Sequence, residues 1–247
     1  MFSKKILFKA SQTYIENNQD ILPTLSKLNI PEWFKNLKHD ITNSTVKGCM
    51  PFLDSLTAGY ILKMPVDYYV EHNVTVDGEK KTGFSSSAEF INQESSKINL
   101  NFNGIQNDHS INQLKDSPHV KKNHNLPIHK ILNPWIIKTP PGYSTLFTPL
   151  LNNQDDRFSI IPAIVDTDTF ENEINFPIVF NGDKYKELKT LIKRGTPYVQ
   201  IIPFKRDNWK MSIKSIDENE LDKKRAYYKK LLVNNYKTFF WKKKSWK

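Results

Sequence analysis

The stretch PWIIKTPPGYSTLFTP, residues 134–149, places two β-forming runs on either side of a turn signal. The first run contains Trp135, Ile136 and Ile137, and the second contains Thr145, Leu146 and Phe147. Proline fixes φ and glycine accepts the left-handed region, so the intervening TPPG favours a rigid turn. The pattern predicts two strands joined at a corner. It leaves open whether that corner borders a site or only connects strands.

Similar runs recur over residues 131–205, as PWIIK, YSTLF, FSIIPAIVD, INFPIVF and PYVQIIPF. Short β runs separated by regular turn signals predict a mainly β fold, a barrel or a sandwich. Strands are also expected over 60–64 and 68–76, and DGEKKTG, residues 77–83, predicts a hairpin turn. Residues 103–130 show little periodicity and predict a long loop or insertion.

Helix signals stand near both ends of the chain. Pro31 followed by Glu32 predicts a short helix, with Trp33 and Phe34 packing on the core. Asp217 and Glu220 resemble a capping box and predict a C-terminal helix. We therefore expect an N-terminal extension (1–44), a core (45–210) with an insertion at about 77–130, and a basic aromatic helix and tail (211–247).

The formal net charge of +10 is concentrated at the C-terminus. Residues 223–247 hold ten Lys or Arg and no Asp or Glu, and seven aromatic residues lie between 227 and 247. This mixture suits stacking on single-stranded nucleic acid together with phosphate contacts. The candidate contacts are Trp241, Lys242, Lys243 and Lys244. An amphipathic helix that packs on a neighbouring subunit explains the same pattern equally well.

Other bulk properties restrict the setting of the protein. The sequence has no apolar run long enough to span a membrane, and its apolar start is too short for a signal peptide. The single cysteine, Cys49, fits a reducing compartment. We expect a soluble cytoplasmic protein, in the host cytoplasm if the source is viral, with no membrane partner.

Common catalytic motifs are missing from the sequence. It has no phosphate-binding P-loop, no dinucleotide-binding glycine motif and no hydrolase elbow. The histidines at 119, 124 and 129 are five residues apart, a spacing that turns them to different faces of a helix or strand, so no metal site is predicted. Cys49 is expected to be an inert thiol.

Asp166 and Asp168 are the candidate catalytic residues. They follow the apolar run IPAIV, and positions i and i+2 share one face of a strand. Two unpaired carboxylates side by side are costly unless they bind something, stay solvated or share a proton. Such a pair could activate a water or hold a metal-bound phosphate. A strand-end turn, where aspartate is common, is the other explanation.

The order of motifs resembles the trimeric dUTPases and dCTP deaminases of the β-clip superfamily. The resembling segments are TAGYIL (57–62), IKTPPGYSTLFTPLLN (137–152), AIVDTDTF (163–170), NEINFPIVFN (172–181) and KRGTPYVQIIP (193–203). The resemblance implies a β-clip core, a homotrimer, and a water-positioning carboxylate at Asp166. It also implies nucleotide contacts at Gly59, Tyr60, Arg194 and Gln200. Mg²⁺ is the expected cofactor if the chain is such an enzyme.

The departures from that pattern fall on residues that such an enzyme needs. Ile61 replaces the acidic residue of the first motif. Leu150 and Leu151 replace polar residues that bind phosphate, and apolar side chains cannot bind phosphate. The glycine-rich C-terminal lid of the family is missing. We therefore expect a β-clip-like protein that binds nucleotide or nucleic acid and is not an active dUTPase.

Two other hypotheses remain open. In a divergent Mg-dependent pyrimidine-nucleotide hydrolase, Lys193, Arg194, Lys205 and Arg206 could supply the phosphate-binding charge. In a structural or virion-assembly protein, the β faces would serve as contact surfaces. The phrases KGCMPFLD, TAGY, TPPGYS and VDTD also resemble a family of phage and bacterial proteins. That second resemblance covers most of the chain and implies no activity.

Overall fold

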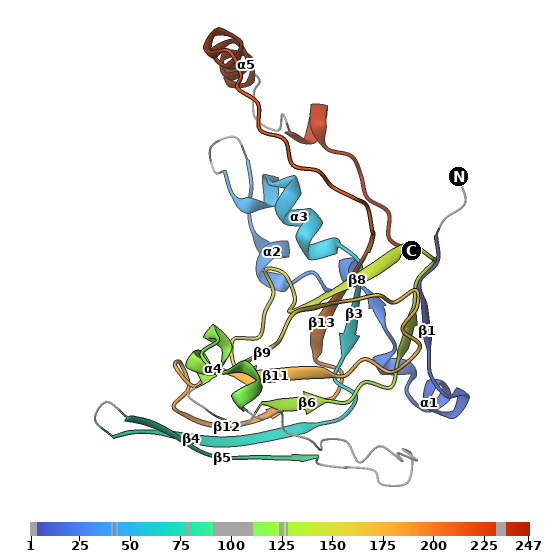
Figure 1. Ribbon diagram of the computed structural model, residues 1–247, viewed down its shortest axis with the longest axis vertical. Helices are drawn as coiled ribbons and strands as arrows, with labels where there is room; N and C mark the ends of the chain where they lie inside the picture. Colours follow the sequence, from blue (N-terminus) through green and yellow to red (C-terminus); the bar gives the residue numbers. More distant parts are fainter. Residues whose placement is uncertain are drawn as a thin grey trace.

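The computed structural model describes residues 4–40, 42, 44–77, 80–90, 111–123, 126, 128–230 and 236–247. Its architecture is mainly β, as the sequence predicts (Figure 1). Every pairing between the described strands is antiparallel, and those strands do not close into a barrel. Of the two predicted architectures, a barrel or a sandwich, the barrel is therefore not observed in this part of the chain.

The elements follow one another in this order. The strands are β1 (Leu7–Lys9), β2 (Thr24–Leu25), β3 (Tyr60–Lys63), β4 (Tyr68–Asp77), β5 (Lys80–Phe90), β6 (His129–Ile131), β7 (Ile136–Lys138), β8 (Tyr143–Thr148), β9 (Phe158–Ile160), β10 (Ala163–Val165), β11 (Phe176–Phe180), β12 (Glu187–Ile192) and β13 (Pro197–Lys205). The α-helices are α1 (Gln12–Asn17), α2 (Glu32–Asn36), α3 (Met50–Thr57), α4 (Pro118–Asn123) and α5 (Glu218–Lys230). Short 3₁₀ turns are η1 (Gln19–Ile21), η2 (Ser26–Asn29), η3 (Val46–Gly48) and η4 (Ile111–Leu114), and η5 (Tyr236–Phe240) is a π-helix.

The largest sheet has the strand order β10-β8-β13-β3-β2. Its central pair, β8 and β13, aligns Phe147 with Ile201, and both side chains are buried. β8 is buried on both faces over much of its length, since Ser144 and Thr148 on one face and Thr145 and Phe147 on the other are all buried. This sheet carries the TPPG turn, the aspartates and the exit of the chain toward the C-terminus.

Three smaller sheets complete the body, with the orders β6-β11-β9, β12-β4-β5 and β1-β7. The predicted run FSIIPAIVD forms two strands, because the chain breaks at Pro162 and passes from one sheet to another. β12 is an addition that the sequence did not predict. One hydrophobic core joins the sheets, and its fully buried side chains include Tyr68, Phe147, Phe180 and Ile201.

The predicted hairpin between β4 and β5 is confirmed by the pairing of Asp77 with Lys80, while its tip at 78–79 lies outside the described residues. The loop expected over 103–130 is wrong at its C-terminal end. There, α4 begins at Pro118, and the Ser117 hydroxyl caps it by accepting from the Val120 N–H. β6 follows and pairs with β11, with Ile131 opposite Phe176. His119 lies in α4 and His129 in β6, whereas residues 109 and 124 lie outside the described part.

The predicted N-terminal helix is confirmed as α2, but Trp33, which was expected to pack on the core, is 46% exposed. Its Phe34 is buried and stacks on Phe52 of α3, with ring centroids 5.8 Å apart. Pro51 belongs to the first turn of α3, where no helical N–H bond is lost.

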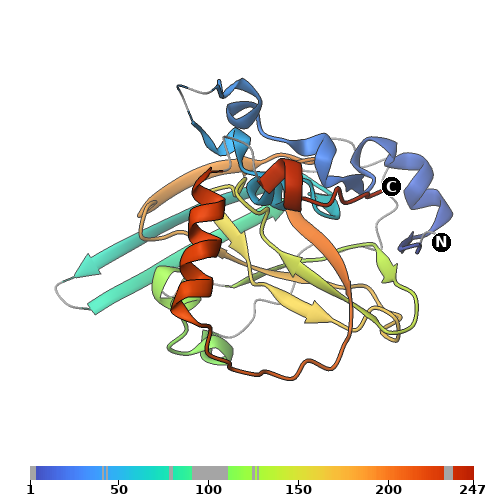
Figure 2. The ribbon, with the colours of Figure 1, turned by 90° about the horizontal axis from the view of Figure 1, so that it is seen from above.

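The chain leaves the sheet after β13 and makes a long excursion. Residues 206–217 contain no helix or strand and lead away from the sheets to α5 (Figures 1 and 2). Asp217 caps α5 as predicted, because its carboxylate accepts from the Glu220 N–H at 3.1 Å. After η5, residues 241–247 return to the body near α3 and β3.

Candidate functional site

The TPPG turn reverses the chain just before β8. Tyr143 N–H donates to the Pro140 carbonyl at 3.2 Å, and Gly142 has φ +81°. With Pro141 ahead of it, this is the pattern of a type II turn, which needs glycine at its third position. The peptide N–H of Gly142 then points outward and donates to Asp168 Oδ2 at 2.7 Å. The turn borders a polar cluster and is more than a corner between strands.

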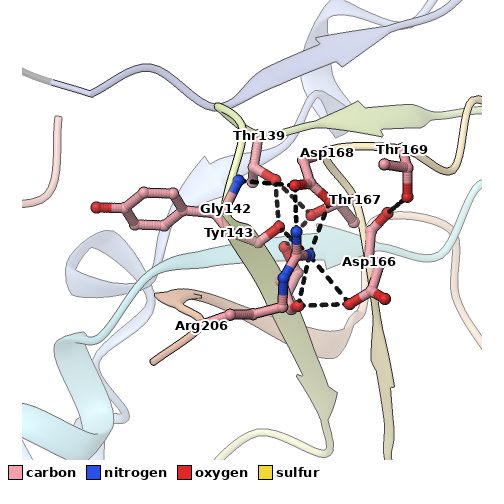
Figure 3. A network of polar contacts seen from close by, with 10 residues as sticks. Thr139, Gly142, Tyr143, Asp166, Thr167, Asp168, Thr169 and Arg206 are labelled. Atoms are coloured by element: carbon pink, nitrogen blue, oxygen red, sulfur yellow. Dashed lines mark hydrogen bonds and ion pairs between the residues drawn. The ribbon is translucent and has the colours of Figure 1, made fainter. Parts of the chain in front are cut away.

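That cluster forms around Arg206 at the end of β13 (Figure 3). Arg206 Nη1 lies 2.8 Å from Asp168 Oδ1 and 3.2 Å from Asp166 Oδ1. Arg206 Nη2 makes a second contact, with Asp168 Oδ2, so the guanidinium binds that carboxylate at two points. Both aspartates contact the same guanidinium, but they lie in the turn that follows β10, which ends at Val165, and not on one strand face. A strand-end turn was the other explanation for this pair.

The two carboxylates have different surroundings. The Asp168 side chain is 4% exposed and the Asp166 side chain is 62% exposed. Asp166 also accepts from the Ser144 hydroxyl at 2.6 Å. The Arg206 ion pair and the Gly142 N–H hold the pKa of Asp168 down to about 2. The same pair raises the pKa of Arg206.

This electrostatic balance decides what the cluster can do. A general base works best with a pKa near the working pH, and Asp168 lies far below neutral pH. Arg206 supplies the positive charge that two adjacent carboxylates require. The geometry is that of a clamp between the turn, β10 and the end of β13. The catalytic role predicted for Asp166 and Asp168 stays a prediction.

Three threonine hydroxyls lie beneath the clamp. Thr167 Oγ1 is 2.7 Å from Thr139 Oγ1 and 2.7 Å from Thr145 Oγ1, and all three side chains are buried. Thr139 also donates to the Tyr143 carbonyl at 3.1 Å. These contacts fix the segment between the two aspartates against the turn.

Gln200, expected to contact a nucleotide, is buried in β13. Its Nε2 donates to the carbonyls of Ser55 and Ala58 at 2.9 and 2.7 Å, and its Oε1 accepts from the Leu151 N–H at 2.9 Å. Both amide hydrogens are used. The side chain ties α3 and the end of β8 to the sheet.

Gly59 and Tyr60, also expected at a nucleotide site, lie where β3 packs on β13. Gly59 has φ +70°, and a Cβ there would fall 1.9 Å from the Ile201 carbonyl oxygen. Tyr60 packs edge-on against Phe8 and Trp246, and its hydroxyl donates to the Lys247 carbonyl at 3.1 Å. Gly59 permits a close approach of the backbone, and Tyr60 holds the chain end.

Arg194 lies at the opposite end of β13 from Arg206. It pairs with Asp20 and donates to Asn18 Oδ1 at 2.9 Å. The nine residues of β13 separate the two arginines by roughly 30 Å. Arg194 therefore does not join Asp166 and Gln200 in one site.

The candidate nucleic-acid contacts divide into two groups. Trp241 Nε1 and Lys244 Nζ both donate to Asp54 Oδ2, at 3.0 and 2.6 Å, which pins the returning tail to α3. Lys242 and Lys243 are exposed and have no acidic partner among the described residues.

An aromatic surface precedes this tail. Tyr227 and Tyr228 of α5 and Tyr236, Phe239 and Phe240 of η5 are all exposed. Phe240 joins the two helices, since its ring lies 5.6 Å from that of Tyr228. Lys223 and Lys237 are exposed beside these rings in the sequence. The sequence pattern of aromatic residues from 227 onward already indicated this surface, although the named candidate contacts were only those at 241–244.

Within the described ranges, no group of three His, Cys, Asp or Glu side chains could hold a metal ion, and no helix is both long and apolar enough to cross a bilayer. No protein-family model, curated protein or solved structure matches the chain.

Proposed function

We propose that this protein binds single-stranded nucleic acid through the surface formed by α5, η5 and the returning tail, on a β-clip-like core that is not catalytic. The observation that carries the proposal is the exposure of Tyr227, Tyr228, Tyr236, Phe239 and Phe240 in a segment where every charged residue from 223 onward is basic. The core serves as the scaffold for this projection.

The chemistry fits a single strand. Exposed rings stack on bases of any sequence, and lysines contact the backbone phosphates. Within the described residues, Lys223, Lys237, Lys242 and Lys243 form no ion pair, whereas Lys224 pairs with Glu220 and Lys244 with Asp54. Four phosphate contacts give an expected slope of log K against log salt of about −3 for a single strand.

The alternative of nucleotide hydrolysis is less well supported. The polar groups of Gln200 and Arg194 form hydrogen bonds within the molecule. Arg206 keeps Asp168 ionised by lowering its pKa. These residues were the ones through which the dUTPase resemblance implied a nucleotide site. A nucleotide would have to displace contacts on which the fold depends.

A thermal-shift screen separates the two functions. It compares deoxynucleoside mono-, di- and triphosphates, with and without Mg²⁺, against a short oligothymidylate. A ligand at a hundred times its dissociation constant stabilises a protein by about 2.7 kcal/mol. We expect the oligothymidylate to raise the melting temperature and the nucleotides to leave it unchanged. A shift given only by a pyrimidine nucleotide with Mg²⁺ would overturn the proposal.

A further inference from the structure

The segment between β13 and α5 has the pattern of a strand without a partner. Trp209, Met211 and Ile213 alternate with Lys210, Ser212 and Lys214, and the three apolar side chains are 84–90% exposed. Successive side chains of an extended chain point to opposite sides, so this alternation gives one apolar face and one polar face. A contiguous apolar face in water marks an interaction surface.

A complementary edge lies on the largest sheet. β10 is its outermost strand and, among the described residues, pairs only with β8. Ile164, at the centre of β10, is 63% exposed. In register across the sheet, Ile164 lies opposite Leu146, which lies opposite Ile202. An apolar row thus ends at an open strand edge, which can accept one more strand.

The charges of the two surfaces are opposite. Residues 158–183, which contain β10, include no Lys or Arg. On their surface, Asp166 pairs with Arg206 and Glu171 with Lys138, while Glu173 is exposed. The arm itself, residues 207–216, contains Lys210 and Lys214 and a single Asp, Asp207, which pairs with Lys205. Attraction between these segments favours their pairing and aligns the chains during encounter.

The segment does not reach this edge in its own molecule. The Arg206 N–H donates to the Gly142 carbonyl at 2.8 Å, and the Arg206 side chain binds Asp168, so the chain leaves β13 past the TPPG turn and away from the sheets (Figure 1). β8 also lies between β13 and β10 in the sheet. A return to β10 would require a reversal around the end of β8.

We propose that residues 207–216 of one copy add a strand to the β10 edge of a second copy, with Trp209, Met211 and Ile213 on the side of Ile164. The Arg206–Asp168 clamp sets the direction in which this arm leaves each molecule. This self-association is independent of nucleic-acid binding, since it uses a different part of the C-terminal excursion.

Disulfide trapping tests the pairing directly. In a Cys49→Ser background, one chain carries Ile164→Cys and a differently tagged chain carries Met211→Cys. Adjacent strands bring Cβ atoms to about 4.5–5.5 Å, within reach of a disulfide. After nuclease treatment, mixing and mild oxidation, we expect a disulfide between the two tagged chains. Leu28→Cys, at a 67% exposed leucine of η2, is the matched control partner for Met211→Cys and should give little product.

Sedimentation velocity supplies a second readout without cysteines. The unmodified chain should sediment as two copies or more, Ile164→Lys should shift it to a monomer, and Leu28→Lys should not. The proposal would be overturned if Ile164→Cys and Leu28→Cys gave equal yields of disulfide with Met211→Cys. It would also be overturned if the unmodified chain sedimented with the mass of a single chain. So would an intrachain disulfide in dilute Ile164→Cys/Met211→Cys protein, which would show that the arm folds back on its own β10. Oligothymidylate binding that persists in Ile164→Lys would show that the two proposals stand separately.

Discussion

The guanidinium of Arg206 binds the Asp168 carboxylate at two points, although 38 residues separate them in the chain. The same carboxylate accepts the Gly142 N–H of the TPPG turn. One ion pair therefore connects the turn, the end of β10 and the last residue before the C-terminal excursion. Stability and the direction of the arm both depend on it.

Replacing Asp168 by asparagine should lower the free energy of unfolding at neutral pH and remove a pH dependence. The pKa of Asp168 is about 2 in the folded chain and near 3.8 in its ordinary environment. A group with a lowered folded pKa stabilises the fold above its unfolded pKa, and this stabilisation is lost as the pH falls through the folded value. Urea unfolding measured from neutral pH down to about pH 2.5 should show the difference between wild type and Asp168→Asn shrinking below pH 3.8.

Asp156→Asn is the control for that series. Like Asp168, Asp156 forms an ion pair, here with Lys184, but both of these side chains are more than half exposed. Exposed ion pairs contribute little to stability. An equal loss of stability in the two variants would contradict the assignment of Asp168 as a clamp.

Gly59 and Gly142 form a matched pair for a second prediction. Both have positive φ, at +70° and +81°, but a Cβ at Gly59 meets the Ile201 carbonyl, whereas a Cβ at Gly142 meets nothing within 4 Å. Gly142→Ala should cost about 1–2 kcal/mol of backbone strain. Gly59→Ala should add about 1–3 kcal/mol of overpacking to the same strain. Chemical denaturation measures both, and similar losses would show that the close approach at Gly59 is relieved easily.

Gln200→Met should destabilise the fold without weakening oligothymidylate binding. The substitution leaves the Leu151 N–H and the carbonyls of Ser55 and Ala58 without their partner, at about 1–3 kcal/mol for buried groups of this kind. Gln154→Met, at an exposed position, should change neither quantity. If well-folded Gln200→Met protein bound oligothymidylate more weakly than wild type, Gln200 would belong to a binding site.

The regular strands could be predicted from local sequence, because alternating apolar residues and turn signals are local. The helix α3 could not, since Gly48, Pro51 and Gly59 are residues typical of turns. In the structure Pro51 lies in the first turn of the helix, and both glycines lie outside it. β12 escaped prediction because its alternation is short: exposed Glu187 and Lys189 flank buried Leu188, but the pattern becomes irregular from Thr190 onward.

The site was harder to predict than the fold. Asp166 and Asp168 lie close together, but in a turn after β10 and not on the shared strand face that their spacing suggested. That spacing could not indicate that Arg206, from another strand, lies between them, because a long-range ion pair leaves no local pattern. The same limit applies to Asp54, which holds Trp241 and Lys244 from 187 and 190 residues away.

Aromatic stacking gives a fourth prediction. Tyr228→Ala and Phe240→Ala should each weaken binding of a fluorescent oligothymidylate by about 1–3 kcal/mol, which is the usual loss for a base that stacks on an aromatic ring. Phe170→Ala removes an aromatic ring of similar exposure next to the clamp and should leave the affinity unchanged. Equal losses in all three variants would indicate a general effect on folding.

The measurement that tests the central claim most directly is the salt dependence of oligothymidylate binding, followed by fluorescence anisotropy. The triple variant Lys237→Gln/Lys242→Gln/Lys243→Gln is compared with Lys115→Gln/Lys121→Gln/Lys122→Gln, which removes the same charge from exposed lysines in and next to α4. We expect a wild-type slope of about −3, a slope smaller in magnitude by about 2 in the first variant, and no change in the second. A flat salt response in the wild type, or equal slopes in both variants, would contradict nucleic-acid binding by this surface.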